Sequence, residues 1–323
     1  MLRVGHPASL GAEFLRILPD GIELVALPDG LGHDVEIDVW IPDPYPTRAL
    51  RIWPRLRGVR LVLSLMAGTE WIAATVGPHV TICNARGAHS VSTAEWTISA
   101  TLAMLKHSPL FQDLQHAADW GGRNQATTEF QSVTGDARSL HPPVMVEELT
   151  GKHVLLVGYG AIGKEIERML APFRVELVRV ARNPRIDPCV YPVGSLDRLL
   201  PTADVIILIL PLNDESRELI GAHQFGLIRQ GALLVNAARG AIVDTDALVH
   251  ALNNGKVRAA LDVTDPEPLP AEHPLWRCPN LLLTPHVAAS TPQFAARALE
   301  VVADELRRYL NGKPLRNVVQ ITR

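Results

Sequence analysis

The chain has 323 residues and a formal charge of −3, which suits about two domains and argues against a basic nucleic-acid-binding surface. Hydrophobic residues make up 47% of the sequence, enough to build buried cores. The three cysteines, Cys83, Cys189 and Cys278, form neither a CxxC pair nor a zinc spacing, so we expect a reduced intracellular protein with no metal site.

The sequence predicts neither a secretory signal nor a membrane span. Charged residues stand near the N-terminus, MLRVGHPASLGAEFLRIL, where a signal peptide needs an apolar segment. The most apolar run, VIILILPL at 205–212, is too short to cross a bilayer. We therefore expect a cytoplasmic protein with no membrane partner.

The first 120 residues alternate strand-like runs with a helical pattern. Four short apolar runs predict strands at 22–27, 35–41, 59–65 and 80–85. A helix is expected in SVSTAEWTISATLAMLKH, with Ser92 and Glu95 at capping-box spacing and Pro109 interrupting it.

Residues 121–148 are polar, marked by Pro and Gly and only weakly patterned, so they are expected to form a long surface connection. After them the alternation returns with stronger strands. Their continuous apolar runs are typical of strands covered on both faces, and these strands are predicted at 153–158, 175–181, 204–210, 232–238, 257–263 and 280–285. The final pattern, FAARALEVVADELRRYL at 294–310, predicts a helix.

A glycine motif follows the strand KHVLLV and precedes a helix. Gly158, Gly160 and Gly163 form G-x-G-x-x-G, in which the first glycine allows a tight turn and the second a close approach to a pyrophosphate. The third lets helix and strand pack closely, and the helix N-terminus offers amides to the anion. Glycine turns also close ordinary β–α units, but this context favours dinucleotide binding.

Polar side chains follow three of the predicted strands, where ligands bind in open α/β sheets. Arg239 follows ALLVNAA, Asp262 ends VRAALDV with Glu267 five residues later, and His286 follows NLLLTP. Three of these residues also have a purely structural interpretation: Arg239 as a solvated loop arginine, Glu267 as a turn residue between two prolines, and His286 as a core histidine. Together they place a carboxylate binder, a carboxylate and a titratable base beside the glycine turn.

With these motifs the sequence resembles the D-isomer-specific 2-hydroxyacid dehydrogenases over nearly its whole length. The segments that match in order are PLNDESRELI, LLVNAARGAIVDTDAL, AALDVTDPEPLP and TPHVA. The resemblance implies that Arg239, Glu267 and His286 are catalytic and that Asp262 lies beside the nicotinamide carboxamide. It further implies that LMAGTEW at 65–71 holds the substrate carboxylate with the amides near Ala67 and Gly68.

The resemblance also implies a fold of class α/β with two doubly wound parallel-sheet domains and a cleft between them. Residues 98–287 would form the dinucleotide-binding Rossmann domain, and 1–97 with 288–323 a smaller flavodoxin-like substrate domain. A homodimer is usual in the family. The expected cofactor contacts besides the glycines and Asp262 are Ala161, Ile162, Pro211, Ala237, Arg182 and Arg185.

The expected chemistry is the reduction of a 2-oxo acid. Arg239 can fork two donors to the substrate carboxylate and carbonyl, and His286 is the natural proton donor near neutral pH. A neighbouring carboxylate such as Glu267 favours the imidazolium form of the histidine. A formate dehydrogenase, which has no proton to deliver, carries an amide at the position of Glu267, so the resemblance argues against that activity. The alternative is a dinucleotide-sensing corepressor or scaffold on the same fold. The substrate stays open among glyoxylate, hydroxypyruvate, pyruvate and bulkier 2-oxo acids, with Leu65, Met66, Trp71 and Trp276 as candidate pocket residues.

The segment VELVRVARNPR departs from the family where NAD-using relatives place an acid after the second strand. That position holds Ala181, which cannot repel a 2′-phosphate, and Arg182 and Arg185 add positive charge. NADP(H) is therefore the expected cofactor. NAD(H) stays possible if ARNPR is only a solvated turn.

Overall fold

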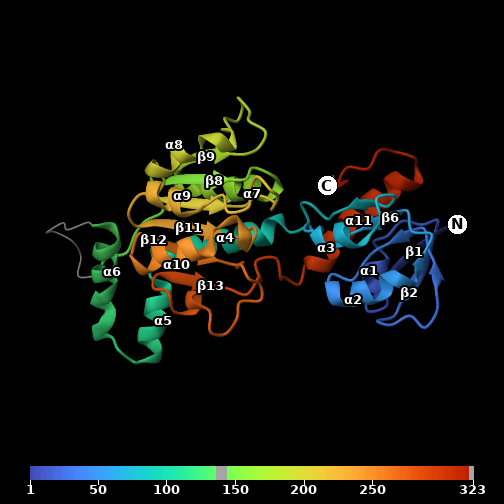
Figure 1. Cartoon of the computed structure of the whole chain (residues 1–323), viewed down its shortest axis with the longest axis horizontal. Coiled ribbons are helices and arrows are strands. Elements are labelled where there is room, and N and C mark those ends of the chain that lie inside the picture. Colours follow the sequence, from blue (N-terminus) through green and yellow to red (C-terminus); the bar gives the residue numbers. More distant parts are fainter. Residues whose placement is uncertain (136–143, 320–323) are drawn as a thin grey trace. The chain divides into compact units, whose positions relative to one another are not determined.

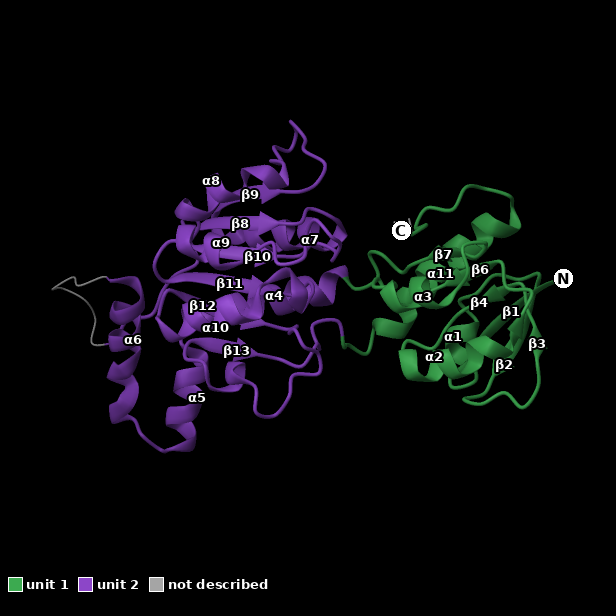
Figure 2. Cartoon of the chain, in the orientation of Figure 1, with its two compact units in different colours: residues 1–89, 290–323 green, residues 90–289 purple. Residues whose placement is uncertain are grey.

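The computed structural model describes residues 1–135 and 144–319, and the chain divides into two compact units (Figure 2). Unit 1 comprises Met1–His89 and Ser290–Arg323, and unit 2 comprises Ser90–Ala289. The first division precedes helix α4 (Ser90–Leu105), which runs unbroken through the boundary expected at 97/98.

Unit 1 is built on a parallel sheet with the strand order β2-β1-β4-β6-β7 in the described residues. Renumbered along the sheet, this is the flavodoxin-like order 2-1-3-4-5. The strands are β1 (Leu2–Pro7), β2 (Ile22–Leu27), β4 (Val39–Trp40), β6 (Leu61–Leu63) and β7 (Thr81–Cys83), and a separate parallel pair joins β3 (Val35–Glu36) to β5 (Leu56–Arg57).

Helices cover both faces of this sheet, so its apolar residues form two clusters (Figure 1). The helices are α1 (Ala12–Leu15), α2 (Pro46–Ile52), α3 (Glu70–Thr75) and α11 (Phe294–Leu310). α11 buries Leu299, Val302 and Leu306 at spacings of three and four against Leu61 and Leu63. The C-terminal helix thereby belongs to the core of unit 1.

Unit 2 contains the second parallel sheet, with the order β13-β12-β11-β10-β8-β9 among described residues. Its strands are β8 (His153–Val157), β9 (Glu176–Val180), β10 (Val205–Leu208), β11 (Ala232–Asn236), β12 (Val257–Leu261) and β13 (Leu281–Leu283). The chain passes outward from β8 to β9 and returns to β10 on the other side of β8. The carboxyl end of β8 is therefore the topological switch point, the place where such sheets bind ligands.

The core of unit 2 lies on both faces of this sheet. In β10, Ile206 and Leu208 join one apolar cluster while Val205 and Ile207 join the other, and all four are fully buried. The flanking helices are α4, α5 (Ser108–His116), α6 (Gln125–Thr134), α7 (Ala161–Leu170), α8 (Leu196–Leu199), α9 (Ala222–Leu227) and α10 (Thr245–Asn253). The predicted α/β class with two doubly wound parallel sheets is confirmed.

Short 3-10 turns connect many of these elements. They are η1 (Trp53–Arg55), η2 (Gly121–Asn124), η3 (Ala171–Phe173), η4 (Val193–Ser195), η5 (Leu200–Thr202), η6 (Gly240–Ile242) and η7 (Pro274–Arg277). No helix in the described part of the chain is long and apolar enough to cross a membrane.

Three local predictions were wrong. The strand expected at 35–41 is divided into β3 and β4, which belong to different sheets, and the carboxylate of Asp38 between them accepts the amide of Arg3 at 2.9 Å. The capping box is wrong because α4 already begins at Ser90, so Ser92 is a buried residue inside it. The connection expected at 121–148 contains α6, and its residues 136–143 lie outside the described part.

Candidate active site

Four loops of unit 2 begin at the carboxyl ends of parallel strands. Gly158 follows β8, Ala237 follows β11, Asp262 follows β12 and Thr284 follows β13. Because parallel strands all end at the same edge of a sheet, the glycine turn and the predicted polar residues share the edge that holds the switch point. The fold of unit 2 therefore supplies one place for a dinucleotide and for acid–base groups.

The three glycines of the turn meet different surroundings. A Cβ on Gly158 would lie 2.3 Å from the carbonyl oxygen of Ile209, and its φ of +112° also favours glycine. A Cβ on Gly163 would lie 2.3 Å from the carbonyl oxygen of Gly158. A Cβ on Gly160 would meet no atom within 4 Å. Gly158 and Gly163 are thus needed for packing, whereas Gly160 leaves open space.

That open space lies at the N-terminus of α7. Gly160 is the N-cap residue in an extended conformation, and no side chain caps the helix. The first amides of a helix have no partner inside it and attract anions. The open space together with the uncapped amides of Ala161 and Ile162 fits the pyrophosphate of a dinucleotide.

A cluster of charged and aromatic side chains lies beside the turn, after β9. Tyr159 donates its hydroxyl to Glu167, which also accepts from Arg179. The guanidinium of Arg185 lies 5.4 Å from the centroid of the Tyr159 ring, and its Nη2 is 3.5 Å from the Tyr159 carbonyl oxygen. Arg182 is exposed, and no ion pair joins it to another described residue. Ala181 is half-buried at the end of β9 and offers no charge.

His286 and Glu267 form a direct contact at this edge. The Nδ1 of His286 lies 2.6 Å from Oε1 of Glu267, and the two side chains are 44% and 41% exposed. The other ring nitrogen, Nε2, is therefore the one that can exchange a proton with a ligand. This is the geometry of an imidazole that a carboxylate holds in one orientation.

The loop that carries His286 is held by the buried carboxylate of Asp262. Its Oδ1 accepts from the Thr284 hydroxyl at 2.6 Å and from the Val287 amide at 2.9 Å, and Oδ2 accepts from the Ala288 amide at 2.8 Å. The amide of His286 donates to the Asp262 carbonyl oxygen at 2.7 Å. These bonds hold His286 at a φ of +54°, which is uncommon for a residue other than glycine.

Arg239 lies on a turn that the last residue of β11 holds in place. Asn236 is 1% exposed; its Nδ2 donates to the Arg239 carbonyl oxygen at 2.9 Å and its Oδ1 accepts from the Ala238 amide at 3.0 Å. The Nη1 of Arg239 donates to the Ala238 carbonyl oxygen at 2.7 Å. A Cβ on Gly240 would lie 2.0 Å from the carbonyl carbon of Thr264, so only glycine lets this turn pack against the loop that leads to Glu267.

The predicted substrate loop lies in unit 1, between β6 and α3. Its carbonyl oxygens at Leu65, Met66 and Ala67 accept from His89 Nε2 at 3.1 Å, the Ala85 amide at 3.0 Å and Asn84 Nδ2 at 2.8 Å. The amides of Ala67 and Gly68 have no hydrogen-bond partner among residues 1–135 and 144–319. A loop with its carbonyls turned to the scaffold and its amides unpaired suits an anion.

The remaining predicted residues take varied positions. Pro211 is exposed and its carbonyl oxygen accepts from Ser216, whereas Ala237 is half-buried and its amide donates to Leu208 at 3.3 Å. Of the candidate pocket residues, Leu65 is buried, Met66 and Trp71 are half-buried, and Trp276 in η7 is half-exposed with its Nε1 donating to Pro270.

Sequence reasoning missed the residues that support these loops: Asn84, His89, Tyr159, Asn236, Gly240 and Thr284. Asn236, Gly240 and Thr284 stand inside quoted motifs, and the signal for each was its place within three residues of Arg239 or His286. For Asn84 and His89 the sequence offered no periodicity or motif, because their partners are backbone atoms about twenty residues away.

Residues 98–288 match the family profile described as D-isomer specific 2-hydroxyacid dehydrogenase, NAD binding domain. This range falls inside unit 2, which carries the glycine turn.

Whole-chain relatives agree with this match. A glyoxylate reductase from Aeropyrum pernix is 32% identical over 94% of this chain and 93% of its own. A Thermus thermophilus protein of known structure is 30% identical, with a TM-score of 0.75 over 99% of this chain and all of its own. An NADPH-dependent glyoxylate/hydroxypyruvate reductase from Sinorhizobium meliloti, solved with NADP and sulfate, has a TM-score of 0.79 over 99% of this chain and 98% of its own, and at 23% identity it shows the fold alone.

Proposed function

Because the chain belongs to the D-isomer specific 2-hydroxyacid dehydrogenases, we propose that it reduces a 2-oxo acid to the D-2-hydroxy acid, with NADPH as the preferred source of hydride. The observation that carries this proposal is the contact between His286 Nδ1 and Glu267 Oε1 at the sheet edge that also carries the uncapped glycine turn. An acid–base pair and a dinucleotide cradle at one edge suit a reaction that moves a hydride and a proton.

His286 is the proposed proton donor. The cofactor, when bound, supplies a hydride to the carbonyl carbon of the substrate, and the carbonyl oxygen then needs a proton. His286 Nε2 delivers it, because Nδ1 is engaged by Glu267. The Glu267 carboxylate fixes the ring through its contact with Nδ1, and such acid–base help is worth about 10²- to 10⁴-fold in rate.

The substrate carboxylate is assigned to Arg239 and to the amides of Ala67 and Gly68. A guanidinium can donate two parallel bonds to a carboxylate, which an ammonium group cannot. The unpaired amides of the 65–71 loop support the second half of this assignment, and unit 1 is accordingly the proposed substrate domain.

The dinucleotide is assigned to unit 2, whose residues 98–288 match the NAD binding domain. The proposed contacts are Gly158, Gly160, Ala161, Ile162, Gly163, Arg182, Arg185, Pro211, Ala237 and Asp262. Asp262 would contact the dinucleotide only with the part of its carboxylate that is not already engaged. Its two oxygens accept hydrogen bonds from Thr284, Val287 and Ala288.

The preference for NADPH rests on the arginines after β9. No acid stands at Ala181 to repel a 2′-phosphate, and the nearby Glu167 is engaged by Arg179 and Tyr159. Arg182 is exposed and without an ion pair to the described residues, so its charge is available to a phosphate. A charge-assisted bond of this kind is worth about 1.5–3 kcal/mol, about ten- to a hundredfold in affinity.

The decisive experiment is turnover of glyoxylate, hydroxypyruvate, pyruvate and bulkier 2-oxo acids with NADPH and with NADH. We expect turnover of at least one small 2-oxo acid and a higher kcat/KM with NADPH.

Arg182→Ala should raise KM for NADPH about tenfold and leave KM for NADH nearly unchanged, while exposed Arg277→Ala serves as the matched control. No turnover with dinucleotide binding retained would favour the alternative, a dinucleotide-sensing corepressor or scaffold. Equal kcat/KM with the two cofactors would overturn the NADPH preference.

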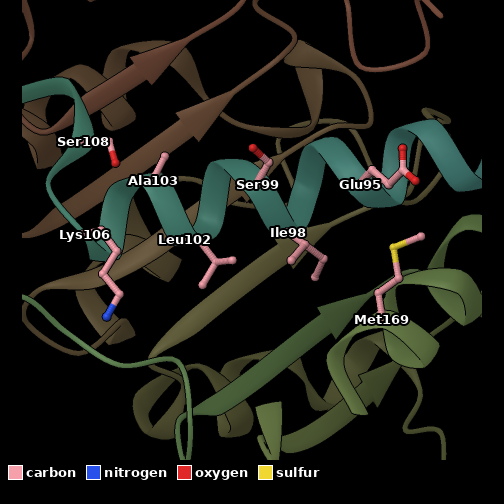
Figure 3. A pocket seen from close by; sticks show the side chains of 8 residues that line it. All are labelled: Glu95, Ile98, Ser99, Leu102, Ala103, Lys106, Ser108 and Met169. Carbon is pink, nitrogen blue, oxygen red and sulfur yellow. The ribbon is translucent and has the colours of Figure 1, made fainter. Parts of the chain in front are cut away.

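A homodimer is the proposed assembly, and the helices α4, α5 and α6 of unit 2 support it. A hollow of about 520 Å³ runs along α4, lined by Ile98, Leu102 and Ala103 and by Met169 of α7 (Figure 3). A second groove of about 600 Å³ follows α5, with Phe111, Leu114 and Trp120 in its lining. Exposed apolar side chains that are rimmed by polar residues are typical of surfaces that a partner covers.

A reducing, cytoplasmic compartment is the proposed location. All three cysteines are free thiols, and burial together with the negative charge of Glu305 raises the pKa of the Cys83 thiol to about 12. A thiol held in that state is inert toward disulfide exchange.

A further inference from the structure

The loop at 65–71 takes its shape from a segment that follows the next strand, β7. His89, Ala85 and Asn84 each donate one hydrogen bond to a successive carbonyl of the loop, at Leu65, Met66 and Ala67. Before them, the amide of Ser64 donates to the Cys83 carbonyl oxygen at 2.9 Å. With three carbonyls in a row fixed toward this segment, the amides at 67 and 68 face away from it.

His89 is the member of this segment that the rest of unit 1 holds in place. Its side chain is 7% exposed, and its ring stacks on Phe294 with centroids 4.6 Å apart and planes 8° apart. His89 is the last residue before the chain leaves unit 1, and Phe294 begins α11 after the chain returns. The imidazole is thus clamped between the substrate loop and the helix that carries the core of unit 1.

The ring acts as a neutral donor. Burial, and after it the positive charge of Arg297, lower the pKa of His89, while the hydrogen bond to Leu65 opposes them. Because a carbonyl oxygen can only accept, the proton of the neutral ring is on Nε2. Its removal would leave the Leu65 carbonyl, a buried backbone acceptor, without this bond.

We propose that His89 is a positioning residue for the carboxylate-binding loop: it holds Leu65 so that the amides of Ala67 and Gly68 present a fixed pair of donors to the 2-oxo acid. This inference rests on the proposed function. It assigns His89 an effect on substrate binding and none on the dinucleotide, whose predicted contacts lie in unit 2.

The test compares two substitutions of His89 by KM, by kcat and by direct binding. His89→Phe keeps an aromatic ring for Phe294 but removes the donor, and His89→Gln keeps a donor for Leu65. We expect His89→Phe to raise KM for the 2-oxo acid about tenfold, with kcat changed by less than about threefold. The dissociation constant of oxalate, an unreactive analogue, should rise equally, and that of NADPH should not change. His89→Gln should restore oxalate affinity to within about threefold of wild type.

Each outcome separates this proposal from the proposed function. Oxalate affinity unchanged in His89→Phe, or an equal loss in His89→Gln, overturns the role of His89 while wild-type turnover stands. A fall in kcat alone or in NADPH affinity alone in His89→Phe also overturns the role of His89, since such a result would mark His89 as a merely structural residue. A wild-type protein that neither reduces a 2-oxo acid nor binds oxalate overturns both. If His89→Phe does not fold, Phe294→Leu removes the clamp and should weaken oxalate binding; wild-type affinity there overturns the proposal.

Discussion

Buried polar residues at strand ends hold the loops that carry the proposed catalytic side chains. Asn236 ends β11 and holds the turn of Arg239, and Asp262 follows β12 and holds the loop of His286. Both are at most 2% exposed, and both satisfy backbone groups that no strand pairs. Their position on the rigid sheet lets exposed loops keep a fixed geometry, which acid–base catalysis needs. His286 and Glu267 can therefore remain accessible to a substrate without losing their mutual contact.

The contact between His286 and Glu267 predicts the effect of a substitution at the residue scale. Glu267 Oε1 engages His286 Nδ1 at 2.6 Å, so it fixes the ring and leaves Nε2 as the nitrogen that would deliver the proton. Glu267→Gln should lower kcat/KM about ten- to a hundredfold, because a neutral amide holds the ring less firmly than a carboxylate. The measurement is kcat/KM for the preferred 2-oxo acid at saturating NADPH. Exposed Glu272→Gln is the control, and an unchanged kcat/KM in Glu267→Gln would remove Glu267 from this role.

At the scale of the element, the three glycines of the turn have different surroundings, so we expect their substitution to affect folding and binding differently. Gly158 and Gly163 have backbone atoms where their Cβ would lie, so these positions keep β8, β10 and α7 together. Gly160 has open space in the same direction, although it belongs to the same motif. We therefore expect Gly158 and Gly163 to be needed for packing and Gly160 for ligand binding, and substitution of each glycine can test its role.

Gly160→Ala should fold normally and bind NADPH at least about tenfold more weakly, because its Cβ would occupy the space in front of the α7 amides. Gly163→Ala should instead destabilise the protein by about 1–3 kcal/mol, since its Cβ overlaps the Gly158 carbonyl oxygen. Fluorescence titration of NADPH and thermal unfolding measure the two effects. Gly226→Ala, whose Cβ meets nothing within 4 Å inside α9, should leave NADPH affinity unchanged and should not destabilise the protein. Unaltered NADPH affinity in Gly160→Ala would place the pyrophosphate elsewhere.

Elements with a strong local pattern could be predicted, and those held by distant partners could not. β8, β10, β11 and β12 are continuous apolar runs, and α11 has its apolar residues at threes and fours, so their bounds follow from the sequence. α6 buries only Ala126, Thr127 and Val133, which is too weak a periodicity to detect. β1 was not predicted because Arg3, Gly5 and His6 interrupt its apolar pattern, although it lies between β2 and β4.

The residues of the candidate site also divide into those that the sequence could predict and those that it could not. Motif residues such as Gly158, Arg239 and His286 could be named because each follows a strand at a fixed offset. The direct contact between His286 and Glu267 could only be inferred from resemblance, since the loop between them has no periodicity. The support that Asp262 gives to three residues of the His286 loop was not foreseen, because hydrogen bonds to backbone amides leave no pattern in the sequence.

At the scale of the whole molecule, one part of unit 2 lacks a core of its own. α5 contains no buried residue, and the helices α5 and α6 project from the sheet (Figure 1). Trp120, between them, is 82% exposed, with the Arg123 guanidinium 5.7 Å from its ring centroid. A helix without fully buried residues gains little stability from packing, and packing supplies most of the stability of helices in proteins. A second copy of the chain that covers Trp120 and the groove along α5 would supply the missing contacts.

Substitution of Trp120 tests whether this surface forms the homodimer. Large aromatic side chains at interface centres often contribute more than 2 kcal/mol to association, and a buried charge in the same place opposes it. Size-exclusion chromatography with light scattering should give about twice the 35.3 kDa chain mass for the wild type and the chain mass itself for Trp120→Asp at micromolar concentration. Ile186→Asp, which replaces a 96% exposed side chain on the loop after β9, should remain a dimer. A monomeric wild type would exclude the homodimer. A dimeric Trp120→Asp variant would show that the interface does not lie at α5 and would leave the hollow along α4, lined by Ile98, Leu102 and Met169, as the candidate interface.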